Sequence, residues 1–148
     1  MNEEWKQWEP VAHSEGKYGM YRLCESKDGL EVICRHQDLD RNMRLLFDQH
    51  VYAYTNTNET LTLQVLNGID VRYGLRFYST WSFFIVENSN YIKRLSERAY
   101  GVVDFCHLRH FVFITSDSMT DIISAHEPKV SWITHDLPVP ESDDEDYE

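Results

Sequence analysis

The sequence contains no long hydrophobic run. Its longest uncharged apolar stretch, residues 77–86, is far shorter than the roughly 18 residues that a membrane-spanning helix needs. The first residues include Glu3 and Glu4, whereas an export signal carries Lys or Arg before an apolar segment. We therefore expect a soluble protein in the cytoplasm, with no membrane partner.

Cysteine is scarce. The chain has three cysteines, Cys24, Cys34 and Cys106, an odd number in a chain of 148 residues that is long enough to build a core without disulfides. The sequence predicts reduced thiols in a reducing compartment. Their spacing matches no zinc ribbon.

Common catalytic and nucleotide-binding motifs are also missing. The chain has no Gly-x-Gly-x-x-Gly, no Walker lysine and no Gly-x-Ser-x-Gly elbow. These absences remove the usual signatures of dinucleotide-binding proteins, P-loop proteins and α/β hydrolases. We predict a protein that is not an enzyme and that uses no cofactor and no metal.

Basic residues are few. There are 14 Lys and Arg against 25 Asp and Glu, so the formal charge is −11. Six of the acids lie in the last eight residues, and the rest of the chain still carries −5. An acidic body disfavours phosphate contacts and therefore nucleic acid, and it favours a basic protein partner.

Two apolar runs, residues 81–86 and 110–115, are rich in aromatic and β-branched residues and predict strands buried on both faces. Between them, Asn88 or Ser89 can cap a helix over residues 90–100. Asp28-Gly29 between alternating segments predicts a hairpin with these two residues as its loop. Alternation predicts a strand over residues 42–47, and residues 61–66 favour a short helix although they also alternate like a strand.

The resulting fold class is α+β: a single domain with a mainly antiparallel sheet of about seven or eight strands and one or two short helices. We expect an N-terminal arm packing on the domain (residues 1–16), the α+β domain itself (residues 17–136) and a disordered acidic tail (residues 137–148). The chain is expected to be a monomer or a weak homodimer.

Aromatic residues are abundant, at 14% of the chain. An aromatic face bordered by acids is typical of a protein-binding surface. We predict that a partner contacts Asp38, Asp40, Tyr78, Trp81 and Glu87.

Two alternatives stay open. A metal-binding protein or small enzyme would use His36, Cys106, His107 and His110, which provide soft and imidazole ligands. A structural or regulatory interaction module would instead pair a sheet edge with another chain.

One pattern carries a resemblance. It consists of Trp81, the run Glu87-Asn88-Ser89, Tyr91, the segment Leu108-x-His110-Phe-x-Phe-Ile-Thr-Ser-Asp117, Asp121-Ile-Ile-Ser and Glu127-Pro128. In this pattern the chain resembles a family of small acidic bacterial proteins without established function. Such proteins are similar in size, acidity and α+β build to the immunity partners of bacterial toxins. The resemblance implies a non-enzymatic immunity or antitoxin-like protein that binds and neutralises a basic partner such as a bacterial nuclease toxin.

Overall fold

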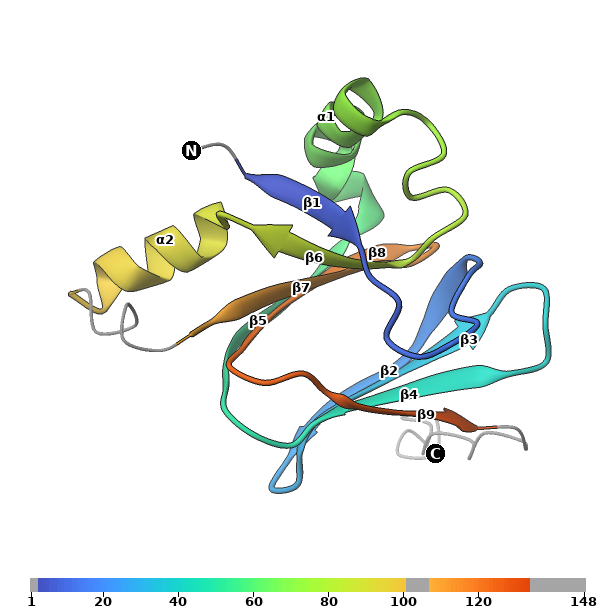
Figure 1. Cartoon of the computed structure of the whole chain (residues 1–148), viewed down its shortest axis with the longest axis horizontal. Helices are drawn as coiled ribbons and strands as arrows, with labels where there is room; N and C mark the ends of the chain where they lie inside the picture. Colours follow the sequence, from blue (N-terminus) through green and yellow to red (C-terminus); the bar gives the residue numbers. More distant parts are fainter. Residues whose placement is uncertain (1–2, 101–106, 134–148) are drawn as a thin grey trace, which may run out of the picture.

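The computed structural model of the chain describes residues 3–100 and 107–133. Within them the chain forms nine strands, two α-helices and one 3-10 turn (Figure 1). The elements follow in the order β1 (Glu4–Gln7), β2 (Tyr18–Ser26), β3 (Gly29–His36), β4 (Asn42–Phe47), β5 (Val51–Asn58), η1 (Glu59–Thr62), α1 (Leu63–Tyr73), β6 (Phe83–Glu87), α2 (Asn90–Arg98), β7 (Arg109–Ile114), β8 (Ser118–Ser124) and β9 (Lys129–Ile133).

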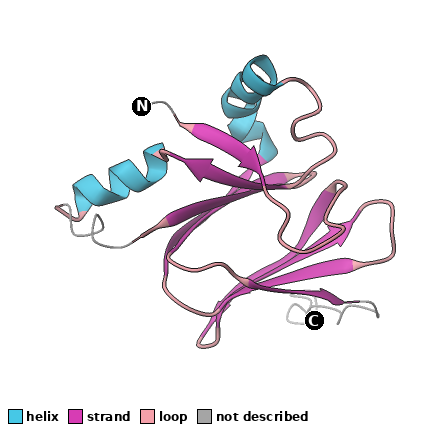
Figure 2. Cartoon of the chain, viewed as in Figure 1, coloured by secondary structure: helices cyan, strands magenta, loops and turns pink. Residues whose placement is uncertain are grey.

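The strands form two antiparallel sheets (Figure 2). Sheet A has the order β1-β6-β7-β8-β5 and sheet B the order β2-β3-β4-β9. A mainly antiparallel architecture with two short helices is therefore confirmed, whereas one sheet of seven or eight strands is wrong. The chain leaves sheet B after β4 and enters sheet A at β5, so residues 48–50 connect the two sheets.

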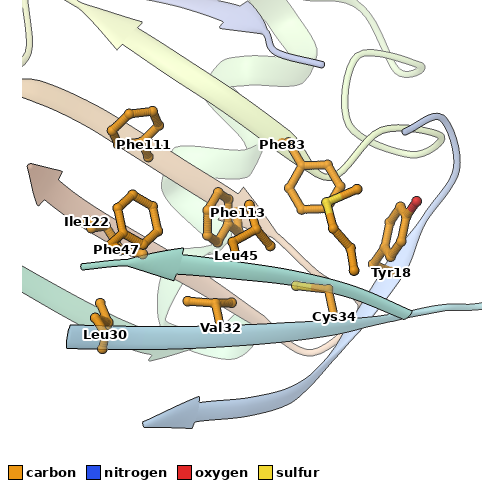
Figure 3. Packing of buried hydrophobic residues seen from close by; sticks show 11 residues of the cluster. Tyr18, Leu30, Val32, Cys34, Leu45, Phe47, Phe83, Phe111, Phe113 and Ile122 are labelled. Carbon is orange, nitrogen blue, oxygen red and sulfur yellow. The ribbon is translucent and has the colours of Figure 1, made fainter. Parts of the chain in front are cut away.

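The main core lies between the two sheets. Large side chains from β6 and β7 of sheet A pack on those of β3 and β4 of sheet B, and Figure 3 shows Phe83, Phe111 and Phe113 above Leu45 and Val32. All five of these side chains have 0% exposure. Alternation in β4 correctly predicts that Met43, Leu45 and Phe47 point inward.

A second cluster lies on the other face of sheet A. Phe84, Val86, Val112 and Ile114 point away from sheet B and are covered by α1 through Leu66, Ile69 and Tyr73. Figure 1 shows α1 and sheet B on opposite sides of sheet A. Side chains on both faces of β6 and β7 are buried, so the prediction of doubly buried strands is confirmed for these two.

The β2–β3 hairpin forms, but with a different register. Its loop is Lys27 and Asp28, and Gly29 pairs with Ser26. Gly29 has φ +123°, and a Cβ there would lie 2.2 Å from the carbonyl oxygen of Phe47 on the neighbouring strand. The positive φ and this close approach both favour glycine at this position, which lies inside β3 and next to the loop. Cys24 and Cys34 are free thiols, as predicted.

The first 16 residues contribute a strand. β1 pairs with β6 at the edge of sheet A, so that Trp5 joins the second cluster and Trp8 packs on the main core. The predicted acidic tail, residues 137–148, lies outside the described residues, and the predicted domain bounds stay predictions.

Helix α2 confirms its predicted start. The Ser89 hydroxyl accepts a hydrogen bond from the Ile92 amide at 3.1 Å, which is a side-chain N-cap. Helix α1 extends to Tyr73, beyond the six residues that we predicted, and buries only one narrow strip of its surface.

Candidate functional site

A groove of about 490 Å³ lies on the outer face of sheet A, between α1 and α2. Thr55 on β5 pairs with Asp121 on β8, and Asp121 pairs with Val112 on β7. Because residues directly opposite each other in a ladder share a face, Thr55 and Asp121 point to the same side as the second cluster. The groove is lined by Thr55, Thr57, His110, Met119 and Asp121 from the sheet, Glu3 and Trp5 from the N-terminus, Leu61, Thr62 and Val65 from η1 and α1, and Asn90, Tyr91 and Arg94 from α2.

Ser89, His110 and Asp121 form a hydrogen-bonded chain, which we call the Ser–His–Asp chain. His110 Nε2 lies 2.7 Å from Asp121 Oδ1, and His110 Nδ1 lies 2.7 Å from Ser89 Oγ. Because an ionised carboxylate only accepts, we assign the proton to Nε2, and Nδ1 then accepts from the serine hydroxyl. The serine oxygen in turn accepts from the Ile92 amide, so the Ser–His–Asp chain connects β8, β7 and the start of α2.

These three residue types also form the triad of serine hydrolases, but their placement here differs. Ser89 is only 5% exposed and does not line the groove. Its oxygen is engaged as the N-cap of α2. Both ring nitrogens of His110 are occupied as well. The arrangement fixes α2 against sheet A and holds the Asp121 carboxylate in one orientation.

Within the Ser–His–Asp chain, the carboxylate of Asp121 is the group that can still bind a ligand. Its Oδ1 accepts from His110, whereas the one contact of Oδ2 within residues 3–100 and 107–133 is a long one of 3.5 Å with the Thr55 hydroxyl. The side chain is 18% exposed. The rings of Tyr91 and His110 pack in an edge-on arrangement. Burial raises the pKa of Tyr91, and the nearby negative charge of Asp121 raises it further.

A second cavity, of about 500 Å³, lies on the other side of α1 and contains the ammonium group of Lys17. Lys17 Nζ donates to the carbonyl oxygens of Tyr78 at 2.7 Å and Ile114 at 2.6 Å. Burial lowers the pKa of Lys17 to about 8, against the opposing effect of Glu59. The Tyr78 hydroxyl donates to Asp70 at 3.2 Å, and the pKa of Tyr78 is raised by burial and by Asp70.

The solvent side of η1, α1 and the following loop carries five exposed aliphatic side chains, which we call the α1 apolar surface. Their exposed fractions range from 44% to 81%. Gly68 lies in the same segment, and a Cβ placed on it would meet nothing within 4 Å. The α1 apolar surface consists of Leu61, Leu63, Val65, Val71 and Leu75.

The predicted partner-binding residues lie in separate places. Asp38 and Asp40 are exposed on the loop between β3 and β4. Glu87 is exposed at the end of β6, where it pairs with Lys6 at 3.0 Å. Tyr78 and Trp81 are half-buried in the loop before β6 and pack on the second cluster. Tyr78 and Trp81 therefore share one cluster, to which none of the three acids belongs.

The residues of the metal or enzyme alternative do not converge in the described part of the chain. His36 belongs to sheet B, where its Nδ1 accepts from the amides of Asp38 and Leu39, both at 3.0 Å. His110 lies on the outer face of sheet A, and His107 is exposed just before β7. Cys106 lies outside the described residues. Over residues 3–100 and 107–133, no group of three or more His, Cys, Asp or Glu could hold a metal ion.

Sequence reasoning found His110 but missed its partners. Ser89 was predicted only as a helix cap, and Asp121 was named only as part of the resemblance, without a functional role. The sequence could have indicated the α1 apolar surface, because its aliphatic residues occur on several sides of the segment and cannot all be buried along one helical stripe.

Comparison with known proteins found no matching protein family, no matching curated protein and no matching solved structure. None of the helices in the described residues is long and apolar enough to cross a membrane.

Proposed function

We propose that the protein is a non-enzymatic binding protein that neutralises a basic protein partner, in the way that immunity proteins neutralise bacterial nuclease toxins. The observation that supports this best is the α1 apolar surface. Exposed aliphatic area that is concentrated on one segment of a protein is typical of a surface that binds another molecule. Val71 is 81% exposed and Leu61 79% exposed, so both are available to a partner.

Gly68 supports docking at this surface. A glycine inside a helix costs roughly 1 kcal/mol relative to alanine. In the part of the chain that the structure describes, nothing lies close enough to Gly68 to require its small size. A missing side chain lets the backbone of a partner approach the helix closely, which gives this glycine a use in binding.

The charge of the protein supports a basic partner. The formal charge of −11 accelerates encounter with a positively charged surface and lets the protein compete with nucleic acid for such a surface. Glu3 and Asp121 place carboxylates in the groove beside Leu61 and Val65, so the apolar surface continues into an acidic one.

In this proposal the protein acts in the cytoplasm, as a monomer or weak homodimer, with residues 17–136 as a single domain. Tyr78 adjoins the α1 apolar surface because it lines the cavity that Leu63 also lines. Asp38, Asp40, Trp81 and Glu87 remain predicted contacts of a larger interface.

The experiment combines affinity capture with surface variants. The immobilised protein is exposed to bacterial lysate at low and at near-physiological salt, and the captured protein is then purified and titrated. We expect a basic protein that stays bound at near-physiological salt, whose activity is blocked at a one-to-one ratio. Val71→Glu and Leu61→Glu should abolish this binding, because each places a charge in the apolar contact.

Gln49→Glu is the matched control, since it adds the same charge at an exposed residue of the loop between β4 and β5, away from every predicted contact. It should bind as the wild type does. The proposal is wrong if retention occurs only at low salt, since screening would then identify nonspecific charge attraction. It is also wrong if the helix variants and the loop control bind equally well.

A further inference from the structure

We propose that the groove between α1 and α2 is a binding site for a guanidinium group, and that it receives an arginine side chain of the partner with Asp121 as its ion-pair acceptor. The assignment of the arginine to a protein partner rests on the proposed function. The recognition of the guanidinium rests on the groove alone.

The groove has the chemistry that an arginine side chain requires. A guanidinium group is planar and presents five N–H donors, and it stacks on aromatic faces. The residues that line the groove include the aromatic Trp5 and Tyr91, the threonines Thr55 and Thr57, and the acid Asp121. Aromatic side chains together with a carboxylate and other oxygen acceptors match this group better than they match a compact ammonium ion.

Asp121 is prepared for this role by the Ser–His–Asp chain. Because His110 Nε2 holds Oδ1 at 2.7 Å, the carboxylate does not need to be reoriented when a ligand arrives. Among the described residues, the second oxygen has only the 3.5 Å contact with Thr55, so it can accept a stronger hydrogen bond. At 18% exposure it lies low in the groove, where an ion pair is screened less than at the surface.

The other charges that line the groove are Glu3 and Arg94. Glu3 adds a negative charge and is held in place, because its carboxylate accepts from the Asn90 amide at 2.8 Å and the Trp5 indole at 3.2 Å. Arg94 lies with its guanidinium carbon 5.8 Å from the centre of the Tyr91 ring. Within the described residues no ion pair joins Arg94 to Asp121, so the carboxylate is not neutralised by it.

The groove is continuous with the α1 apolar surface. Leu61 and Val65 belong to that surface and also line the groove. A partner segment that covers the aliphatic side chains therefore has its next side chain at the entrance of the groove. The arrangement is that of an apolar contact with one charged anchor, which is common at the centre of protein interfaces.

The test uses a small probe and needs no partner. N-acetyl-arginine amide is titrated into the full chain while amide resonances are followed by NMR. We expect saturable shifts confined to residues around the groove, with a Kd of about 1 mM, a typical affinity for a single anchored side chain. The neutral analogue N-acetyl-citrulline amide should bind about tenfold more weakly, because the charge-assisted hydrogen bonds are lost.

Asp121→Asn should weaken arginine binding by about tenfold or more. Asp117→Asn, an exposed acid on the β7–β8 turn, is the matched control and should bind normally. If Asp121→Asn does not fold, Arg94→Gln tests the same idea, because removing the like charge should strengthen binding severalfold. Arg94 is exposed, so this variant is expected to fold.

The inference fails if the probe produces no saturable shifts, if citrulline binds as well as arginine, or if the shifts lie away from the groove. The guanidinium site fails, while the proposed function stands, if Val71→Glu no longer binds a captured basic protein but Asp121→Asn binds it fully. If the probe binds as expected and no protein is captured, the guanidinium site stands and the proposed function fails.

Discussion

Lys17 makes the stability of the protein depend on pH in a way that the structure quantifies. Burial lowers its pKa from 10.5 to about 8. The folded protein therefore releases this proton more readily than the unfolded chain does. Between pH 8 and pH 10.5 the unfolded chain binds more protons, so the free energy of unfolding rises with pH through this window. Below pH 8 the cost of burying the charge is fully present.

The difference between the two pKa values corresponds to a cost of about 3 kcal/mol at pH 7. Of this, about 1.4 kcal/mol is recovered between pH 7 and pH 9. Lys17→Met removes this titration while keeping an unbranched apolar stem. It also leaves the carbonyl groups of Tyr78 and Ile114 without their donor, which costs about 1–3 kcal/mol at every pH. The pH dependence, and not the stability at one pH, therefore isolates the buried charge.

The assay is urea denaturation at pH 7, 8 and 9 at constant ionic strength. The wild type should gain about 1.4 kcal/mol relative to Lys17→Met from pH 7 to pH 9. The window stops there because burial also raises the pKa of Cys34 to about 12, which lowers stability above pH 9 in both proteins. Lys27→Met, at the exposed hairpin turn, should follow the wild type. Parallel curves for the wild type and Lys17→Met would refute the reasoning.

Three further predictions follow from packing. Ser89→Ala should lower the free energy of unfolding by about 1–3 kcal/mol in urea, since it removes a helix cap and leaves a buried imidazole nitrogen unpaired; an unchanged midpoint would contradict this. Gly68→Ala should raise the unfolding free energy by about 1 kcal/mol. Gly29→Ala should lower it by about 1–3 kcal/mol, because Gly29 has a positive φ and lies close to the Phe47 carbonyl. Thermal melts in which both glycine variants shift in the same direction would contradict these two expectations. Iodoacetamide at neutral pH should label Cys24 well before the buried Cys34, as peptide mapping would show, and equal rates would contradict the burial.

Local patterns predicted the elements whose causes are local. The Ser89 cap predicted the start of α2, and alternation predicted β4 with its inward residues. The hairpin was found from Asp28-Gly29, but Gly29 lies inside β3, where the Phe47 carbonyl approaches too closely for a residue with a Cβ. No pattern in residues 21–36 contains that contact, because it comes from the next strand.

The division into two sheets was beyond sequence reasoning for a similar reason. Residues 48–50 carry the chain from sheet B to sheet A, and no local pattern in the sequence marks this change of sheet. Strand pairing depends on contacts between distant residues, such as Thr55 with Asp121. The length of helix α1 was underestimated, because Leu61, Leu63 and Val65 alternate as in a strand and do not form a buried helical stripe.

The candidate site shows why separate patterns missed a joint structure. Ser89 stabilises α2 through its cap, and the same hydroxyl fixes the ring of His110, which in turn holds Asp121. The start of a helix, the edge of a buried strand and the floor of the groove therefore share one chain of hydrogen bonds. Loss of the serine hydroxyl should consequently weaken arginine binding in the groove, although the serine does not line it. A change in affinity without a change in any lining residue would show that the cap and the carboxylate act together.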